Sequence, residues 1–191
     1  MKKIFLLLAC VAALSGRAQP RISPAPNAFK QDIQKVVAAY PHGFTEITGH
    51  VVEQGPQTTV HASLVMPKGA QESTVTRYTS ALKKIYSWQA LMLSTEDFDE
   101  AVAKYKSLYV QLKGMNVQYV ADDYTLGGTY EAPAEGRKST SSMLYLIRPP
   151  EALKKLRIEV TMQFQFPEWK VSIVMYDKEK EDNESAAAME Q

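Results

Sequence analysis

Residues 156–166, LRIEVTMQFQF, alternate between apolar and polar side chains without a break, and no other feature of the 191-residue chain restricts its fold as much. A period of two is the spacing of a β-strand, in which successive side chains point to opposite faces. Because the polar set should face water, the segment predicts an antiparallel sheet with one face on a core. The apolar set is Leu156, Ile158, Val160, Met162, Phe164 and Phe166.

Further segments have the composition and flanking turns of strands. Residues 54–57, QGPQ, are typical of the turn of a β-hairpin, and FPEW at 166–169 predicts a second tight turn. The segment at 73–80 is weak and is expected to be exposed, whereas the one that bears Trp88 is stronger. The predicted strands, apart from the one above, are 44–53, 58–67, 73–80, 83–93, 116–132 with a break near Asp122–Asp123, 140–148 and 169–177.

Two segments have helical spacing instead. In the first, NAFKQDIQKVVAAYP at 27–41, the apolar side chains form one stripe, which predicts a helix over residues 28–40. Asn27 is a good N-cap for this helix. Pro41 should end it, because a proline cannot continue the hydrogen-bonded ladder.

The second helical segment is EDFDEAVAKYKSLYVQL, at 96–112. Ser94 or Thr95 is expected to cap this helix, and Gly114 should supply the left-handed residue after its last turn. Acidic residues in its first turn are favoured by the helix dipole. Its apolar spacing repeats that of the first helix: Phe98, Val102, Tyr105 and Tyr109 match Phe29, Ile33, Val36 and Tyr40.

The two halves of the chain therefore resemble each other. Each predicted helix precedes antiparallel strands, ALKK occurs at 81–84 and at 152–155, and a proline closes a strand at Pro67 and at Pro133. A tandem duplication of a helix-plus-antiparallel-meander unit explains this, with the helices packed on one face of the sheet. Chance is the alternative, because amphipathic helices of any α+β protein look alike. The α+β class holds under both explanations.

The first eighteen residues have the pattern of a signal peptide. An apolar run at 4–14 follows two lysines and is too short to span a membrane. Gly16 and Ala18 provide the small residues before a cut at Gln19. This ending, RAQ, resembles the signal peptides of secreted proteins from the Bacteroidota lineage. An uncleaved N-terminal anchor is the alternative reading.

The single cysteine, Cys10, lies inside the predicted signal peptide. Lipidation at Cys10 is a further alternative, because LLAC resembles a lipobox. The cut leaves 191 − 18 = 173 residues with no thiol nucleophile, disulfide or cysteine-based metal site. The predicted organisation is a signal peptide at 1–18, a proline-rich tether at 19–27, a first helix-plus-strands unit at 28–94, a second at 95–177 and a disordered tail at 178–191.

Charge and motifs argue against several functions. The net charge is +1 with acids and bases intermixed, so no basic face for nucleic acid is expected.

EGRKST at 135–140 fails as a phosphate loop because Glu131 stands where the first glycine is required. No serine lies in a G-x-S-x-G elbow. The adjacent Asp122 and Asp123 are expected in a turn rather than as an acid–base pair. We therefore expect no cofactor and no catalysis.

Two histidines offer a metal-site hypothesis. A four-residue turn at 54–57 would place His50 opposite His61, with Cβ atoms about 5 Å apart. Two imidazoles at that separation can share a transition metal. A metal site needs three or four ligands, however, and surface imidazoles more often bind nothing.

Aromatic residues offer a second candidate site. Trp88, Tyr105, Tyr109 and Tyr145 fall on faces expected to lie inward or nearly so. Tyr and Trp combine an apolar body with a polar tip, which suits the mouth of an apolar ligand cleft between helix and sheet. The alternative is an ordinary hydrophobic core.

These observations favour an exported bacterial protein, periplasmic or extracellular, that acts as a non-catalytic binding module of the cell envelope. Its partner would be a protein or peptide on the exposed sheet face. The second hypothesis is a periplasmic carrier of a lipid or another apolar ligand, which needs a cavity larger than about 300 Å³ between sheet and helices. The expected outline resembles secreted inhibitors of the β-lactamase-inhibitor type and small envelope-assembly modules, although no motif residue carries over.

Overall fold

The structure is a computed structural model, which describes residues 27–79 and 84–178. Several predicted segments lie outside the described residues: the signal peptide with Cys10, nearly all of the tether and of the tail, and the first ALKK apart from its last residue. The described elements are α1 (Ala28–Ala39), η1 (Tyr40–His42), η2 (Thr45–Ile47), β1 (Thr48–Gln54), β2 (Thr58–Ser63), β3 (Glu72–Thr79), β4 (Lys84–Thr95), α2 (Phe98–Leu112), β5 (Asn116–Tyr119), β6 (Asp122–Thr129), β7 (Ser139–Leu146), η3 (Glu151–Leu153), β8 (Leu156–Gln165) and β9 (Glu168–Asp177).

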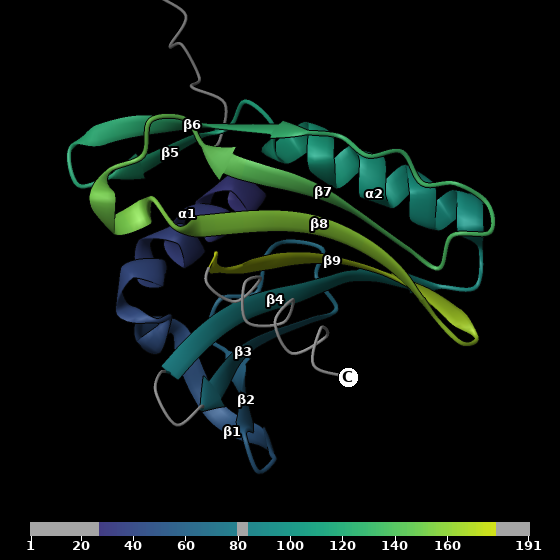
Figure 1. The fold of residues 1–191 in the computed structure, drawn as a ribbon, viewed down its shortest axis with the longest axis horizontal. Coiled ribbons are helices and arrows are strands. Elements are labelled where there is room, and N and C mark those ends of the chain that lie inside the picture. The colour runs from purple at the N-terminus through teal and green to yellow at the C-terminus, as the bar shows by residue number, and fades with distance from the viewer. Residues whose placement is uncertain (1–26, 80–83, 179–191) are drawn as a thin grey trace, which may run out of the picture.

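All the described strands form one antiparallel sheet in the order β1-β2-β3-β4-β9-β8-β7-β6-β5 (Figure 1). The α+β class is thereby confirmed, with one sheet rather than two. The strands after α1 build one half of the sheet and those after α2 build the other, and the halves meet at β4 and β9. The second half has one strand more than the first, and the duplication stays a prediction.

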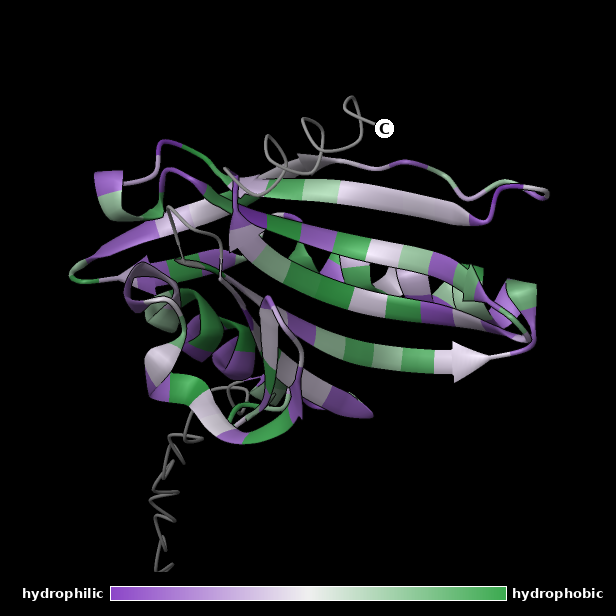
Figure 2. Ribbon diagram, turned by 60° about the horizontal axis from the view of Figure 1, so that its bottom comes forward, coloured by the Kyte–Doolittle hydropathy of each residue, from purple (hydrophilic) through white to green (hydrophobic). Residues whose placement is uncertain are grey.

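One face of the sheet carries the core. The register aligns a row of side chains across five strands, and each of them is at most 1% exposed: Val75, Trp88, Met175, Ile158 and Leu144. Helix α2 lies against β4, β8 and β9, while α1 contacts β5 at the other end. Side chains from both helices join this one buried cluster. Hydrophobic and hydrophilic residues alternate along the central strands, as one-sided burial requires (Figure 2).

The alternation predicted for β8 is confirmed over most of its length. Its apolar positions from Leu156 to Met162 are at most 1% exposed. The prediction is wrong at the end of the segment, because Phe166 is 89% exposed. Phe166 follows the last ladder pair, Gln165 with Glu168, so it belongs to the turn and no longer follows the pleat.

Helix α1 begins as expected. The Asn27 side chain accepts a hydrogen bond from the Phe29 backbone N–H at 3.1 Å, which confirms the N-cap. The helix ends at Ala39, one residue earlier than predicted, and the chain tightens into η1 around Pro41. A proline is tolerated at the start of such a turn because that position needs no backbone donor.

Helix α2 has a different cap from the one expected. Ser94 and Thr95 still belong to β4, and Asp97 is the N-cap. Its Oδ1 accepts from the Glu100 backbone N–H at 3.0 Å. Thr95 supports the cap from outside, because its hydroxyl donates to Glu100 Oε2 at 2.6 Å. Gly114 follows the helix at φ +77°, so the left-handed residue is confirmed.

Asp97→Ala should therefore lower the free energy of unfolding by about 1 kcal/mol, since it leaves the Glu100 N–H without its acceptor. Asp97→Asn keeps an acceptor of the same shape and should lose less than half as much. Urea denaturation followed by circular dichroism measures both values. Equal losses in the two variants would show that charge, rather than the cap hydrogen bond, is what Asp97 contributes.

Candidate functional site

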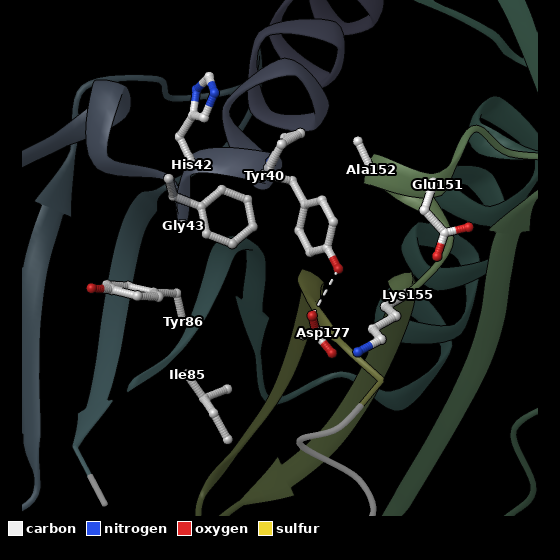
Figure 3. Close-up of a pocket in the computed structure, with 11 residues that line it drawn as sticks. Tyr40, His42, Gly43, Ile85, Tyr86, Glu151, Ala152, Lys155 and Asp177 are labelled. Atoms are coloured by element: carbon white, nitrogen blue, oxygen red, sulfur yellow. Dashed lines mark hydrogen bonds between the residues drawn. The ribbon is translucent and has the colours of Figure 1, made fainter. Parts of the chain in front are cut away.

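A cavity of about 500 Å³ opens at one end of the sheet (Figure 3). We call it the end pocket. Its walls come from elements that are far apart in the chain and meet only in the fold. Its described lining consists of residues 40–44, Ile85 and Tyr86 of β4, Glu151 and Ala152 of η3, Lys155, and Asp177 at the end of β9.

The turn after α1 shapes one wall of the end pocket. Gly43 and Phe44 both have left-handed backbone, at φ +62° and +58°. Their N–H groups are satisfied, because Gly43 N donates to Tyr40 O and Phe44 N to Ala39 O, both at 2.9 Å. Phe44 is not a glycine, so its conformation is strained, and its 1% exposure shows that packing holds it there. A side chain at Gly43 would meet the Tyr86 ring at 2.9 Å.

A hydrogen bond ties this turn to the sheet. The Tyr40 hydroxyl donates to Asp177 Oδ2 at 3.0 Å, which joins η1 to the last residue of β9. Burial, together with the charge of Asp177, raises the pKa of Tyr40 well above its ordinary value. Tyr40 therefore remains a neutral donor over the physiological pH range.

The pocket has an apolar side and a charged side. Figure 3 places Tyr86 and Ile85 on one side, and Glu151 and Lys155 on the other. His42 stands near the rim, where its Nδ1 lies 2.7 Å from Glu46 Oε1. The described lining contains no serine, threonine or cysteine. It can bind a small molecule through mixed polar and apolar contacts, but it offers no serine, threonine or cysteine nucleophile.

The predicted facing of His50 and His61 is wrong. Val51 pairs with His61 instead. Gln54 pairs with Thr59 beside the turn, so the turn begins one residue later than predicted, and irregularities on both sides of Val51 then change the β1–β2 register again. Each β-bulge adds a residue to one strand only, which a count from the turn cannot include. The His61 ring instead donates from Nδ1 to Gly49 O at 3.2 Å. Within residues 27–79 and 84–178, no group of three or more His, Cys, Asp or Glu side chains could hold a metal.

The four aromatic residues of the predicted cleft do not share one surface. Trp88, Tyr105 and Tyr109 are at most 4% exposed and belong to the core, whereas Tyr145 is 47% exposed on the opposite face of the sheet. The polar tips of the three core residues are bonded inside the protein. Trp88 Nε1 donates to Ser63 Oγ at 3.1 Å, and the Tyr109 hydroxyl donates to Gly128 O at 2.9 Å.

Tyr105 belongs to a buried hydroxyl network. Its oxygen lies 2.6 Å from Ser142 Oγ, and its hydroxyl also reaches Glu131 O at 3.1 Å. Burial raises the pKa of Tyr105 to about 12, although the Ser142 hydrogen bond partly opposes that shift. The network joins α2 to β7 and has a structural role.

The face of the sheet opposite Trp88 is the second candidate site, and we call it the outer face. It includes four rows aligned by the strand register: Thr76, Ser87, Tyr176 and Arg157; Thr74, Gln89, Val174, Glu159, Met143 and Thr129; Glu72, Leu91, Ser172, Thr161 and Ser141; and Ser94, Lys170, Gln163 and Ser139. Only Glu72, Arg157, Glu159 and Lys170 are charged among them. Neutral hydroxyl and amide groups therefore dominate a broad surface.

Comparison with known protein families, with curated proteins and with solved structures finds no significant match to this chain. Neither helix in the described part of the chain is long and apolar enough to cross a bilayer. The function therefore has to be argued from the two candidate sites themselves.

The sequence reasoning missed the end pocket. Its described lining contains none of the four aromatic residues and neither of the two histidines, His50 and His61, on which the sequence hypotheses rested. One sequence signal for a wall of the pocket was present in YPHGF at 40–44, where a proline and a glycine follow a helix and indicate a sharp turn. The other walls lie at the ends of strands and have no local pattern.

Proposed function

We propose that the chain is a non-catalytic binding module of the bacterial cell envelope that docks a protein or peptide partner on its outer face. The observation that carries this proposal is the composition of that face. Protein interfaces are depleted of charged residues at their centre and enriched in Tyr, Met and Arg. The outer face follows this trend, with Tyr145, Met143 and Arg157 among mostly neutral side chains.

The arrangement of the helices supports the same proposal. Side chains of α1 and α2 pack into the core on the other side of the sheet. Outer-face residues such as Gln89 and Gln163 are exposed within the described structure. A sheet whose backbone groups are already paired can present such side chains as a rigid platform, so little conformational entropy is lost when a partner binds. Export, as the first eighteen residues predict, would place this platform in the envelope.

A carrier of an apolar ligand is the weaker proposal. The space between α2 and the sheet is filled by fully buried side chains, including Trp88, Tyr105 and Leu108. The end pocket is large enough, but it lies at the end of the sheet and is lined by charged groups. An acyl chain there would make no hydrogen bond to the polar lining and would exclude water from it, which costs free energy.

The proposal predicts that charges added to the outer face abolish partner binding. The double variant Gln89→Lys/Gln163→Lys places two ammonium groups on exposed positions of β4 and β8. Docking would bury them unpaired, so affinity should fall at least tenfold, which corresponds to about 1.4 kcal/mol. The measurement is quantitative mass spectrometry of proteins cross-linked to the tagged mature chain in envelope extract from the source bacterium.

The matched control is Gln31→Lys/Gln111→Lys, which adds the same two charges to exposed positions of α1 and α2. The proposal requires one protein that is recovered by the wild type and this control and is lost from the outer-face variant. It is rejected if no protein behaves in that way, or if recovery is the same with all three chains.

A further inference from the structure

We propose that the end pocket is a second binding site, separate from the outer face, and that it takes a neutral polyhydroxylated ligand, a mono- or oligosaccharide. The volume of about 500 Å³ lies within the range of small-molecule sites, about 300–1,000 Å³. The inference does not depend on the proposed function, because different residues line the two sites.

The two-sided lining favours this class of ligand. A pyranose ring has a face of C–H groups and an edge of hydroxyls. The apolar side of the pocket, Tyr86 and Ile85, suits the C–H face. The opposite side carries the carboxylates of Glu151 and Asp177 and the ammonium group of Lys155 (Figure 3), and Asp177 also accepts from Tyr40. Hydroxyls both donate and accept, so they can hydrogen-bond to carboxylates and to an ammonium group alike without carrying a charge.

Other ligand classes fit the lining less well. A phosphate or another anion would have Lys155 as its cation but would also face the carboxylates of Glu151 and Asp177. An acyl chain would leave all three of these groups desolvated. For a metal ion, the described residues contain no group of three ligating side chains.

The pocket is also formed before a ligand arrives. Gly43 lies against the Tyr86 ring, and a Cβ at this position would meet the ring at 2.9 Å, so the turn packs directly on Tyr86. The hydrogen bond from Tyr40 to Asp177 holds the facing wall. The strained backbone at Phe44 is maintained by burial beside this wall. Backbone strain of this kind is concentrated at ligand sites, and a rigid wall lowers the entropy lost on binding.

The test is a titration of the ¹⁵N-labelled mature protein with free saccharides, monitored by amide chemical shifts. The probes are chitotriose, cellotriose and maltotriose, with decanoate and inorganic phosphate as the competing classes. We expect saturable shifts at Gly43, Tyr86 and Asp177 with at least one trisaccharide, and a Kd on the order of 1 mM. Saturation at these amides by decanoate or phosphate alone would overturn the proposed ligand class.

Two variants test whether a saccharide binds in the end pocket rather than elsewhere on the surface. Tyr86→Ala removes the aromatic wall, and Glu151→Gln removes a carboxylate from an exposed position with little risk to folding. Each should weaken saccharide binding at least fivefold. Tyr145→Ala, on the outer face, should leave it unchanged. The proposal is overturned if no trisaccharide saturates, or if both pocket variants bind as the wild type does. Neither result bears on partner docking, whose test alters β4 and β8 elsewhere.

Discussion

Replacing Trp88 by alanine is expected to lower the free energy of unfolding by about 3–5 kcal/mol, the largest loss that a single side chain of this protein should give. Trp88 is 0% exposed and lies in the buried row between Val75 and Met175. Truncation removes its packing contacts and leaves a cavity in the middle of the sheet. It also removes the hydrogen bond from Nε1 to Ser63 Oγ. Urea denaturation followed by circular dichroism measures the loss.

Two further variants serve as references for the free-energy loss measured with Trp88→Ala. Trp88→Phe keeps most of the apolar volume and should lose about half as much as the alanine variant. Tyr145→Ala, at a 47% exposed position, should lose less than about 1 kcal/mol. The sequence pattern had placed both residues in one ligand cleft. A loss under about 1 kcal/mol for Trp88→Ala would support the ligand-cleft hypothesis, because a side chain at the mouth of a cleft contributes little to stability.

Local patterns predicted those parts of the fold that one segment determines by itself. The alternation from Leu156 to Met162 needed only the knowledge that a strand has two faces, and burial confirmed it. Asn27 acts within its own helix turn, so its role as a cap was also readable. Asp97 was not recognised as a cap because β4 runs through Thr95, and the length of a strand depends on its neighbours in the sheet.

Strand pairing was the first feature that local patterns missed, although one signal was available. Gly49 lies inside β1, and a Cβ there would meet the Ala62 backbone oxygen at 2.8 Å. A glycine within a strand pattern often marks a bulge or a close backbone approach. Gly49 lies in the irregular stretch of β1 between Thr48 and Val51, one of the places where the pairing with β2 changes register. Read as a bulge signal, this glycine would have warned against counting the register from the turn.

Long-range assembly accounts for the other differences. Residues 73–80 were expected to form a weak, exposed strand, yet β3 lies between β2 and β4 with Val75 buried. Its position depends on two neighbouring ladders rather than on its own threonines and serines. The end pocket is a stronger case, because its walls come from η1, β4, η3 and β9. No window of sequence contains those residues together, so only the fold reveals the site.

The second large effect is expected at Gly128 in β6, where alanine should lower the free energy of unfolding by about 3 kcal/mol, at the upper end of overpacking losses. A Cβ at this position would overlap the Met143 backbone oxygen and would lie 3.0 Å from Leu144 Cα. Both atoms belong to the backbone of β7, which cannot rotate away as a side chain can. The strand would have to move, and with it the Gly128 oxygen that accepts from Tyr109 of α2 at 2.9 Å.

Gly127 is a matched control, because it is also a glycine of β6 and lies at the same distance from the edge of the sheet. A Cβ at Gly127 would lie 3.1 Å from side-chain atoms of Ile147, which is 49% exposed and free to change rotamer. Gly127→Ala should therefore change stability by less than about 1 kcal/mol, and reduced entropy of the unfolded chain would favour the alanine. Thermal and urea denaturation of both variants measures the difference. Similar losses at the two positions would mean that β6 tolerates no side chain on either face, whereas a loss confined to Gly128 would locate the constraint in the contact between β6 and β7.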